Sequence, residues 1–275
     1  MSSLPQNFRS AVVHGDLHSL ALLLDEQPQH ANSFVITTRG PVTFLEYSVT
    51  ICAEEDRISV VRLLLARGAR VNSDRADSIS ALHRSLFHGT MSPVTLPLVR
   101  LLLAAGANVD AVHHSFTPLG YLIALINNSH PQHKSMFPPN SELMATLLRA
   151  GASLDVLEQN WPPFDNGTPA TAVAFLDEIR RTDAAISNSE EFFEVRALLA
   201  GVREDGSWKS YARRPHRLIL RLRSLYARGR ATLARTQRRK PRGPDARRDR
   251  AILFLVKLGD NGVLWNVLSF WRATD

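Results

Sequence analysis

The chain repeats a short pattern three times, and this internal similarity is the strongest constraint on its fold. "VRLLLARGARVN" runs from Val61 to Asn72, "VRLLLAAGANVD" from Val99 to Asp110, and "MATLLRAGASLD" from Met144 to Asp155. Similarity at intervals of a few tens of residues is typical of stacked repeat units, each of which is one small supersecondary element. The sequence therefore predicts an array of short units rather than a chain wrapped around one closed core.

Each copy contains a signal for a helix end, and a second motif upstream signals a helix start. The apolar run ends in Gly-Ala, and glycine just past a helix adopts the left-handed conformation without a steric penalty. Upstream motifs such as "TFLE", "SALH", "TPLG" and "TPAT" begin with Thr or Ser, whose oxygen caps the first free amides of a helix. The predicted ends are Gly68, Gly106, Gly151 and Gly201, and the predicted starts are Thr43, Ser80, Thr117 and Thr168.

This alternation of Ser/Thr-(Pro)-Leu starts and Leu-Leu-x-x-Gly-Ala ends resembles the ankyrin repeat, over about Phe8 to Gly201. The segment from Gly68 to Gly89 matches best, and His14-Gly15-Asp16 begins a shorter first copy. The resemblance implies an all-α solenoid of four to five helix pairs joined by short hairpins, with further helices at the C-terminus. It also implies that His83 is bonded near its helix start. We expect three parts: a repeat domain at 1–201, a basic helix and linker at 202–250, and an apolar helical pair at 251–275.

The insertions in this pattern fall between the two helices of a pair. The segments "GTMSPVT", "NNSHPQHKSMFPPNS" and "RTDAAISNS" lengthen successive units and are loop-like in composition. A further segment, "EQNWPPFDNG", lengthens the hairpin before the last pair. We therefore expect loops along one edge of the stack.

Stacked helix pairs present a long concave surface, and such proteins bind partners rather than catalyse reactions. The sequence thus predicts a non-catalytic scaffold for protein–protein interaction, with a protein partner. By resemblance, the contacts come from the hairpin tips and the first helix of each pair. The tips contain Asp74, Arg75, Ala76, His113, His114, Gln159, Asn160 and Trp161, and the exposed first-helix candidates are Glu46, Arg84, His88 and Tyr121. A plain solvated residue, or a core position for Tyr121, is the alternative at each.

Positive charge is concentrated in one segment. The net charge is +7, but Arg203 to Arg250 holds 17 Lys and Arg against 4 Asp and Glu, which gives +13 and leaves −6 for the rest.

Within residues 213–250, leucines recur at helical spacing from Leu218 to Leu225, with Pro215 near a helix start. One interpretation is a helix that packs its leucines and exposes its arginines. The other is a binding surface for nucleic acid or an acidic protein. "TQRRKPRG" also matches a nuclear-localisation patch.

The last residues, "LGDNGVLWNVLSFW" from Leu258, resemble a degenerate form of the first helix of an F-box, with Gly259 in place of the proline. This resemblance implies an adaptor that recruits substrates to a cullin-type ubiquitin ligase. Simple packing of two apolar helices is the alternative.

The sequence offers little for catalysis or metal binding. None of the common phosphate-loop, zinc-protease or hydrolase signatures occurs. His113-His114 and His130-x-x-His133 lack the cysteine or carboxylate partners of a zinc site, so we expect no metal and no cofactor. Cys52, the one cysteine, is predicted to be a core residue in a reducing compartment. We expect no membrane span, and a cytoplasmic or nuclear location.

Overall fold

The computed structural model describes residues 4–38, 40–73, 79–87, 92–113, 116–126, 138–155 and 171–228. These residues are mostly helical, with one small two-stranded sheet. The chain divides into two compact units, Met1–Glu204 and Asp205–Asp275. Among the helices in the described ranges, none is both long enough and apolar enough to span a membrane. The predicted terminal helical pair at 251–275, with its F-box-like segment, lies outside the described residues.

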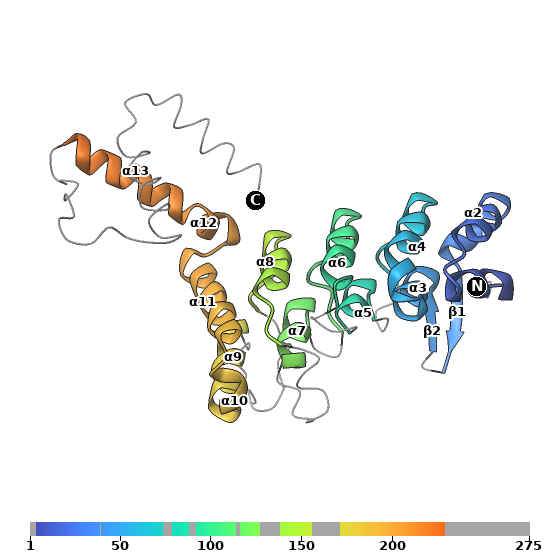
Figure 1. Ribbon diagram of the computed structural model, residues 1–275, viewed down its shortest axis with the longest axis horizontal. Coiled ribbons are helices and arrows are strands. Elements are labelled where there is room, and N and C mark those ends of the chain that lie inside the picture. The colour runs from blue at the N-terminus through green and yellow to red at the C-terminus, as the bar shows by residue number, and fades with distance from the viewer. Residues whose placement is uncertain are drawn as a thin grey trace. The chain divides into compact units, whose positions relative to one another are not determined.

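The first unit contains helices and one hairpin, shown in order along the chain in Figure 1. Its elements are α1 (Gln6–Val13), α2 (Leu17–Glu26), the 3₁₀ helix η1 (Pro28–Asn32), β1 (Phe34–Thr37), β2 (Gly40–Thr43), α3 (Phe44–Ile51), α4 (Glu54–Ala66), α5 (Ala81–Phe87), α6 (Thr95–Ala104), α7 (Pro118–Ile126), α8 (Ser141–Arg149), α9 (Ala172–Thr182), α10 (Ala184–Ser187) and α11 (Glu190–Asp205). The second unit begins at Asp205, the last residue of α11, and contains α12 (Trp208–Ala212) and α13 (Arg214–Ala227).

The predicted helix starts are confirmed at three of four positions. Thr43, Ser80 and Thr117 each accept a hydrogen bond through the side-chain oxygen from the amide three residues later, at 3.2 to 3.3 Å. The fourth prediction, Thr168, is wrong by three residues. Helix α9 begins at Ala172, directly after the "TPAT" quartet, and the last residue of the quartet, Thr171, caps the amide of Ala174 at 3.3 Å. Either threonine has the chemistry of a cap, so the local pattern alone does not choose between them.

The predicted helix ends are also confirmed at three positions. Gly68, Gly106 and Gly151 follow α4, α6 and α8 with φ of 80°, 87° and 98°, in the left-handed region that favours glycine. Gly201 is a correction, because it is buried inside α11, which continues to Asp205. A single glycine inside a helix costs only about 1 kcal/mol, and the residues after it are compatible with the helix. The left-handed glycine after α11 is Gly206, with φ of 74°.

Substituting Gly106 should test this assignment. No atom lies within 4 Å of a Cβ added at Gly106, so the penalty of Gly106→Val comes from the backbone conformation alone. We expect the free energy of unfolding to fall by about 1–2 kcal/mol. Ala105→Val is the matched control, because Ala105 is also exposed but has φ of −80°. It should cost about 0.5 kcal/mol or less. Urea unfolding followed by circular dichroism measures both, and equal losses would contradict the left-handed assignment.

The helices of the first unit pack in pairs, and successive pairs lie side by side. Within pairs, α1 contacts α2, α3 contacts α4, α5 contacts α6, and α7 contacts α8. Between pairs, each odd-numbered helix from α1 to α9 contacts the next, and α2, α4 and α6 form a second row (Figure 1). The interior is filled by fully buried side chains from both rows, among them Phe44, Leu64, Leu98 and Leu102.

A recurring side-chain hydrogen bond joins neighbouring helix pairs, and it connects the loops that follow the second helix of each pair. The Asn72 side chain donates to the Gly106 carbonyl at 2.9 Å and accepts from the Asn108 amide at 2.8 Å. Asn32 makes the same two bonds to the loop after α4, at 2.9 and 2.7 Å. Asp110 makes only the accepting bond to the loop after α8, at 2.9 Å, because a carboxylate has no N–H to donate. These bonds tie each helix end to the preceding pair.

The structure differs from the all-α prediction by a small sheet, and one predicted inter-helix loop is partly helical. Strands β1 and β2 pair antiparallel, with Phe34 opposite Thr43, and form the first hairpin ahead of α3. In the described residues of the later units, the β-pairing consists of isolated bridges, His113 with Phe116 and Asp155 with Thr171. The expected loop "RTDAAISNS" is partly helical, because α10 lies within it. Helix α11 also continues past the predicted domain boundary at 201/202.

Candidate functional site

Three of the twelve residues predicted to contact a partner lie together in the structure. Arg84 is on α5, Tyr121 is on α7, and His113 lies in the turn before α7. All three line one cavity of about 240 Å³. Six further predicted residues lie outside the described part of the chain: Asp74, Arg75, His88, His114, Gln159 and Trp161. The tip residues Ala76 and Asn160 also lie there.

The cavity is built from three consecutive first helices and the segments that lead into them. Helix α5 provides its centre with His83, Arg84 and Phe87, while Thr50 comes from α3 and Ile79 from the segment before α5. His113 and Tyr121 complete the lining from the next unit. Because α5 packs against both α3 and α7, the cavity spans two junctions between neighbouring units.

Arg84 bridges from its own helix to the preceding one. Its Nε donates to the Ile79 carbonyl at 3.3 Å, and its Nη1 donates to Thr50 Oγ1 at 3.4 Å. The Thr50 hydroxyl in turn donates to the Glu46 carbonyl at 3.1 Å. These bonds orient a half-buried guanidinium group along the wall of the cavity, with its charge retained.

His83 forms the buried base of the cavity. The prediction that it is bonded near its helix start is confirmed, because Ser80 Oγ lies 2.8 Å from its Nδ1. Its Nε2 lies 3.2 Å from the Phe116 carbonyl, and since a carbonyl only accepts, Nε2 carries the ring proton. Burial lowers the pKa of His83 to about 4; nearby His113 acts in the same direction, whereas the bond to Phe116 opposes it. His83 is therefore a neutral ring at pH 7.

Aromatic rings form the remaining walls. The His83 ring meets His113 edge-on with centroids 5.9 Å apart, and meets Tyr121 in the same way at 5.6 Å. Tyr121 is half-buried, and burial raises the pKa of its phenol. Phe87 lies at the rim with 56% of its surface exposed. An exposed aromatic ring beside an oriented arginine is an arrangement typical of protein-binding surfaces.

Two residues differ from the sequence-based expectation. Glu46 was predicted to be exposed, and this is wrong: only 1% of its surface is exposed. Its carboxylate accepts from the Thr43 amide at 2.9 Å, which completes a capping box at the start of α3. Phe87 is not among the predicted contact residues, although its position three residues after Arg84 places both side chains on one helix face. That spacing was the available signal.

The thiol of Cys52 does not have the properties of a catalytic nucleophile. Cys52 is buried at the end of α3, and burial raises the pKa of its thiol to about 11, with a further contribution from Asp56. The thiol is protonated at neutral pH and is therefore a poor nucleophile. Among the described residues, no three His, Cys, Asp or Glu side chains gather as metal ligands. His130 and His133 lie outside the described residues.

Comparison with known proteins adds no identification. No protein-family model matches the chain, and no curated protein matches it. Solved structures include a chain from the complex of the predatory endopeptidase Bd0816 from Bdellovibrio bacteriovorus with the immunity protein Bd3460. It shares 15% identity at a TM-score of 0.37, and the match covers 70% of this chain and 97% of that one. A likeness of this size carries no argument for activity.

Proposed function

We propose that this protein is a non-catalytic, ankyrin-type scaffold that binds a partner protein through the cavity on α3, α5 and α7. The repeat organisation supports the scaffold part of this proposal. Confirmed helix starts and ends recur through the first unit, and Asn32, Asn72 and Asp110 make equivalent bonds between neighbours. Units that each bury their apolar face only against a neighbour form a continuous binding surface.

The size and lining of the cavity support a protein partner. Its volume of about 240 Å³ lies below the roughly 300–1,000 Å³ typical of small-molecule and cofactor sites. It has room for one inserted side chain of a partner. The exposed Phe87 ring provides apolar contact at the rim, and Arg84 provides a charged hydrogen-bond donor. Aromatic residues and arginine are also the residues that most often dominate binding energy at interfaces.

The observation that carries the proposal is the exposed Phe87 beside three predicted contact residues. Replacing Phe87 by serine should weaken partner binding by about tenfold or more, because anchor residues at interfaces contribute at least about 1.4–2 kcal/mol. The measurement is quantitative mass spectrometry of proteins captured from native extract by the tagged full chain, followed by affinity measurement with the purified partner.

Phe193→Ser is the matched control for this experiment. Phe193 is on α11 with 53% of its surface exposed, so the chemical change and the exposure are nearly the same. A true partner should be retained by the Phe193 variant and lost by the Phe87 variant. If every captured protein is retained equally by the two variants, this surface is not the binding site.

The single cysteine supports a proposed location. Cys52 is buried as a free thiol, and a chain of 275 residues with one cysteine is typical of a reducing compartment. We propose that the protein acts in the cytoplasm or the nucleus.

A further inference from the structure

Helix α13 in the second unit exposes a row of arginines. Arg217, Arg221 and Arg228 are all exposed, and the helical hydrogen-bond pattern continues to Arg228, whose amide donates to the Ser224 carbonyl at 3.1 Å. At 3.6 residues per turn, the three positions fall within an arc of about 40° on one side of the helix. With a rise of about 1.5 Å per residue, they are spaced by about 6 and 10 Å along it. The row is therefore a straight line of positive charge.

The opposite side of the same helix is already covered. His216 and Ile219 are 9% and 4% exposed. Leu218 and Leu225, with 56% and 37% of their surface exposed, lie along one edge of the arginine row rather than opposite it. The centre of the exposed face is thus basic, and its apolar residues are at the margin.

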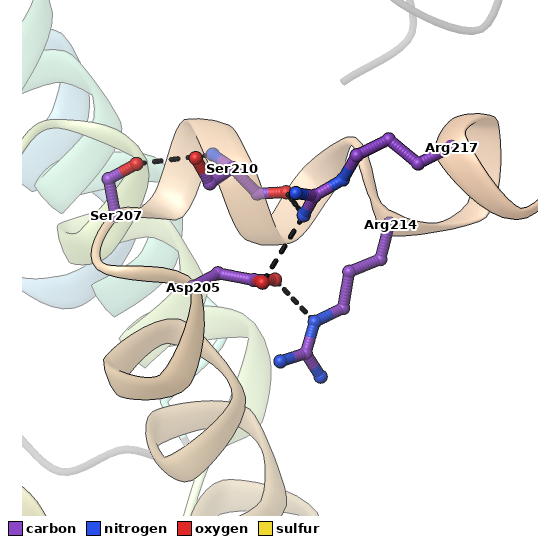
Figure 2. A network of polar contacts seen from close by, with 5 residues as sticks. All are labelled: Asp205, Ser207, Ser210, Arg214 and Arg217. Atoms are coloured by element: carbon purple, nitrogen blue, oxygen red, sulfur yellow. Dashed lines mark hydrogen bonds and ion pairs between the residues drawn. The ribbon is translucent and has the colours of Figure 1, made fainter.

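An aspartate at the start of the unit holds the first turn of this helix in place (Figure 2). Asp205 pairs with Arg214 and, at 3.2 Å, with Arg217, while Arg217 also donates to the Ser210 carbonyl at 2.7 Å. Burial alone would raise the pKa of Asp205, but the two guanidinium groups lower it below its usual value. Asp205 therefore remains charged and keeps α12 and α13 in a defined arrangement.

Little negative charge is available to neutralise the row. Asp205 is the one acidic residue between 205 and 228, against seven Lys and Arg, so this stretch has a net charge of +6. In the part of the chain that the structure describes, Arg221 and Arg228 form no ion pair. Exposed charges of one sign in a line attract a polyanion and release its counterions on binding.

We propose that the exposed face of α13 binds the phosphates of a single-stranded nucleic acid. The spacing of Arg217, Arg221 and Arg228 lets three guanidinium groups contact phosphates along one strand, with Leu218 and Leu225 beside the sugars and bases. Contacts to phosphate give affinity without sequence preference. This inference does not depend on the proposed protein partner, because it concerns the second unit alone.

The arrangement of side chains favours a single strand over two other polyanions. A helix lying on an anionic membrane places its apolar residues at the centre of the buried face and its arginines at the edges. Here the order is reversed, because the arginines hold the centre of the exposed face and Leu218 and Leu225 lie along one edge of the row. A helix in the major groove of a duplex is surrounded by phosphates on both flanks, whereas the exposed arginines of this helix form one row.

The salt dependence of RNA binding tests the proposal. The full chain is titrated into a labelled, unstructured RNA of about 16 nucleotides, and fluorescence anisotropy is followed at several salt concentrations. The affinity should fall steeply with salt. For the double variant Arg221→Gln/Arg228→Gln, the slope of log affinity against log salt should become shallower by about 1.4, since each phosphate contact to a single strand contributes about 0.7. At about 0.1 M salt, affinity should drop about 25-fold.

The matched control is Arg62→Gln/Arg180→Gln, which removes two exposed arginines from α4 and α9. It changes the net charge by the same amount and should leave the slope unchanged. Equal losses in both double variants would overturn the proposal, since attraction would then depend on total charge alone. Salt-independent binding, absence of binding, tighter binding to a duplex, or sedimentation with phosphatidylserine vesicles without RNA binding would also overturn it.

Discussion

Replacing Leu102 by alanine is expected to lower the free energy of unfolding by about 2–5 kcal/mol. Leu102 is fully buried on α6, and it belongs to the core cluster that also contains Val61, Leu64 and Leu98. Truncation removes apolar contacts and leaves a cavity that the surrounding helices fill only partly. Urea unfolding monitored by circular dichroism gives the change, with wild type measured in parallel.

Leu22→Ala is the control for this prediction. Leu22 is on α2 with 51% of its surface exposed, so the same truncation removes far less buried area. Its cost should be about 1 kcal/mol or less. If Leu102→Ala also costs less than about 1 kcal/mol, α6 does not pack with the face that the structure gives it.

The second large effect is a loss of stability on acidification, caused by His83. Its folded-state pKa of about 4 lies below the unfolded value of 6.5, because burial disfavours the charged ring. The unfolded state therefore takes up a proton first as pH falls. The contribution of His83 is complete above pH 6.5 and is lost progressively toward pH 4. Linkage gives a loss of about 2 kcal/mol between pH 7 and pH 5.

Urea unfolding at pH 7, 6 and 5 measures this effect, and His83→Gln isolates it. Glutamine retains an amide donor for the Phe116 carbonyl, but the variant should still be less stable than wild type at pH 7. Because glutamine does not titrate, the variant should lose less stability than wild type on acidification. His14→Gln is the control, because His14 is exposed on the surface. If the His83 and His14 variants have the same pH profile as wild type, His83 is not the buried titrating group.

Helix starts and ends were predictable because the interactions that produce them are local. A threonine cap satisfies an amide three residues away, and a left-handed glycine needs only its own backbone freedom. The predictions at Thr43, Ser80, Gly106 and Gly151 are accordingly confirmed. They are wrong at Thr168 and Gly201, where a neighbouring residue had the same chemistry or where helix-forming residues continued past the glycine.

The candidate site was only partly predictable. Arg84, His113 and Tyr121 were selected by their position in the repeat, and the structure places them around one cavity. Glu46 was selected by the same rule, but its carboxylate is buried in a capping box. Phe87 was not selected because the sequence alone does not distinguish it from Leu82 and Leu86, the apolar core residues of the same helix. Whether it is buried depends on which residues of other units cover it.

The sequence by itself therefore determined the repeat spacing, most helix boundaries, and the concentration of positive charge after residue 203. All of these depend on interactions within a few residues, or on composition. Only the tertiary structure decided that α5 places Phe87 at the rim of a cavity, that His83 is buried beneath it, and that Asp205 orients the arginines of α13. These features depend on contacts between residues distant in sequence or on neighbouring helices. Neighbouring units bury His83, which lowers its pKa, and they leave Phe87 exposed. Both properties therefore belong to the packed array rather than to any one repeat.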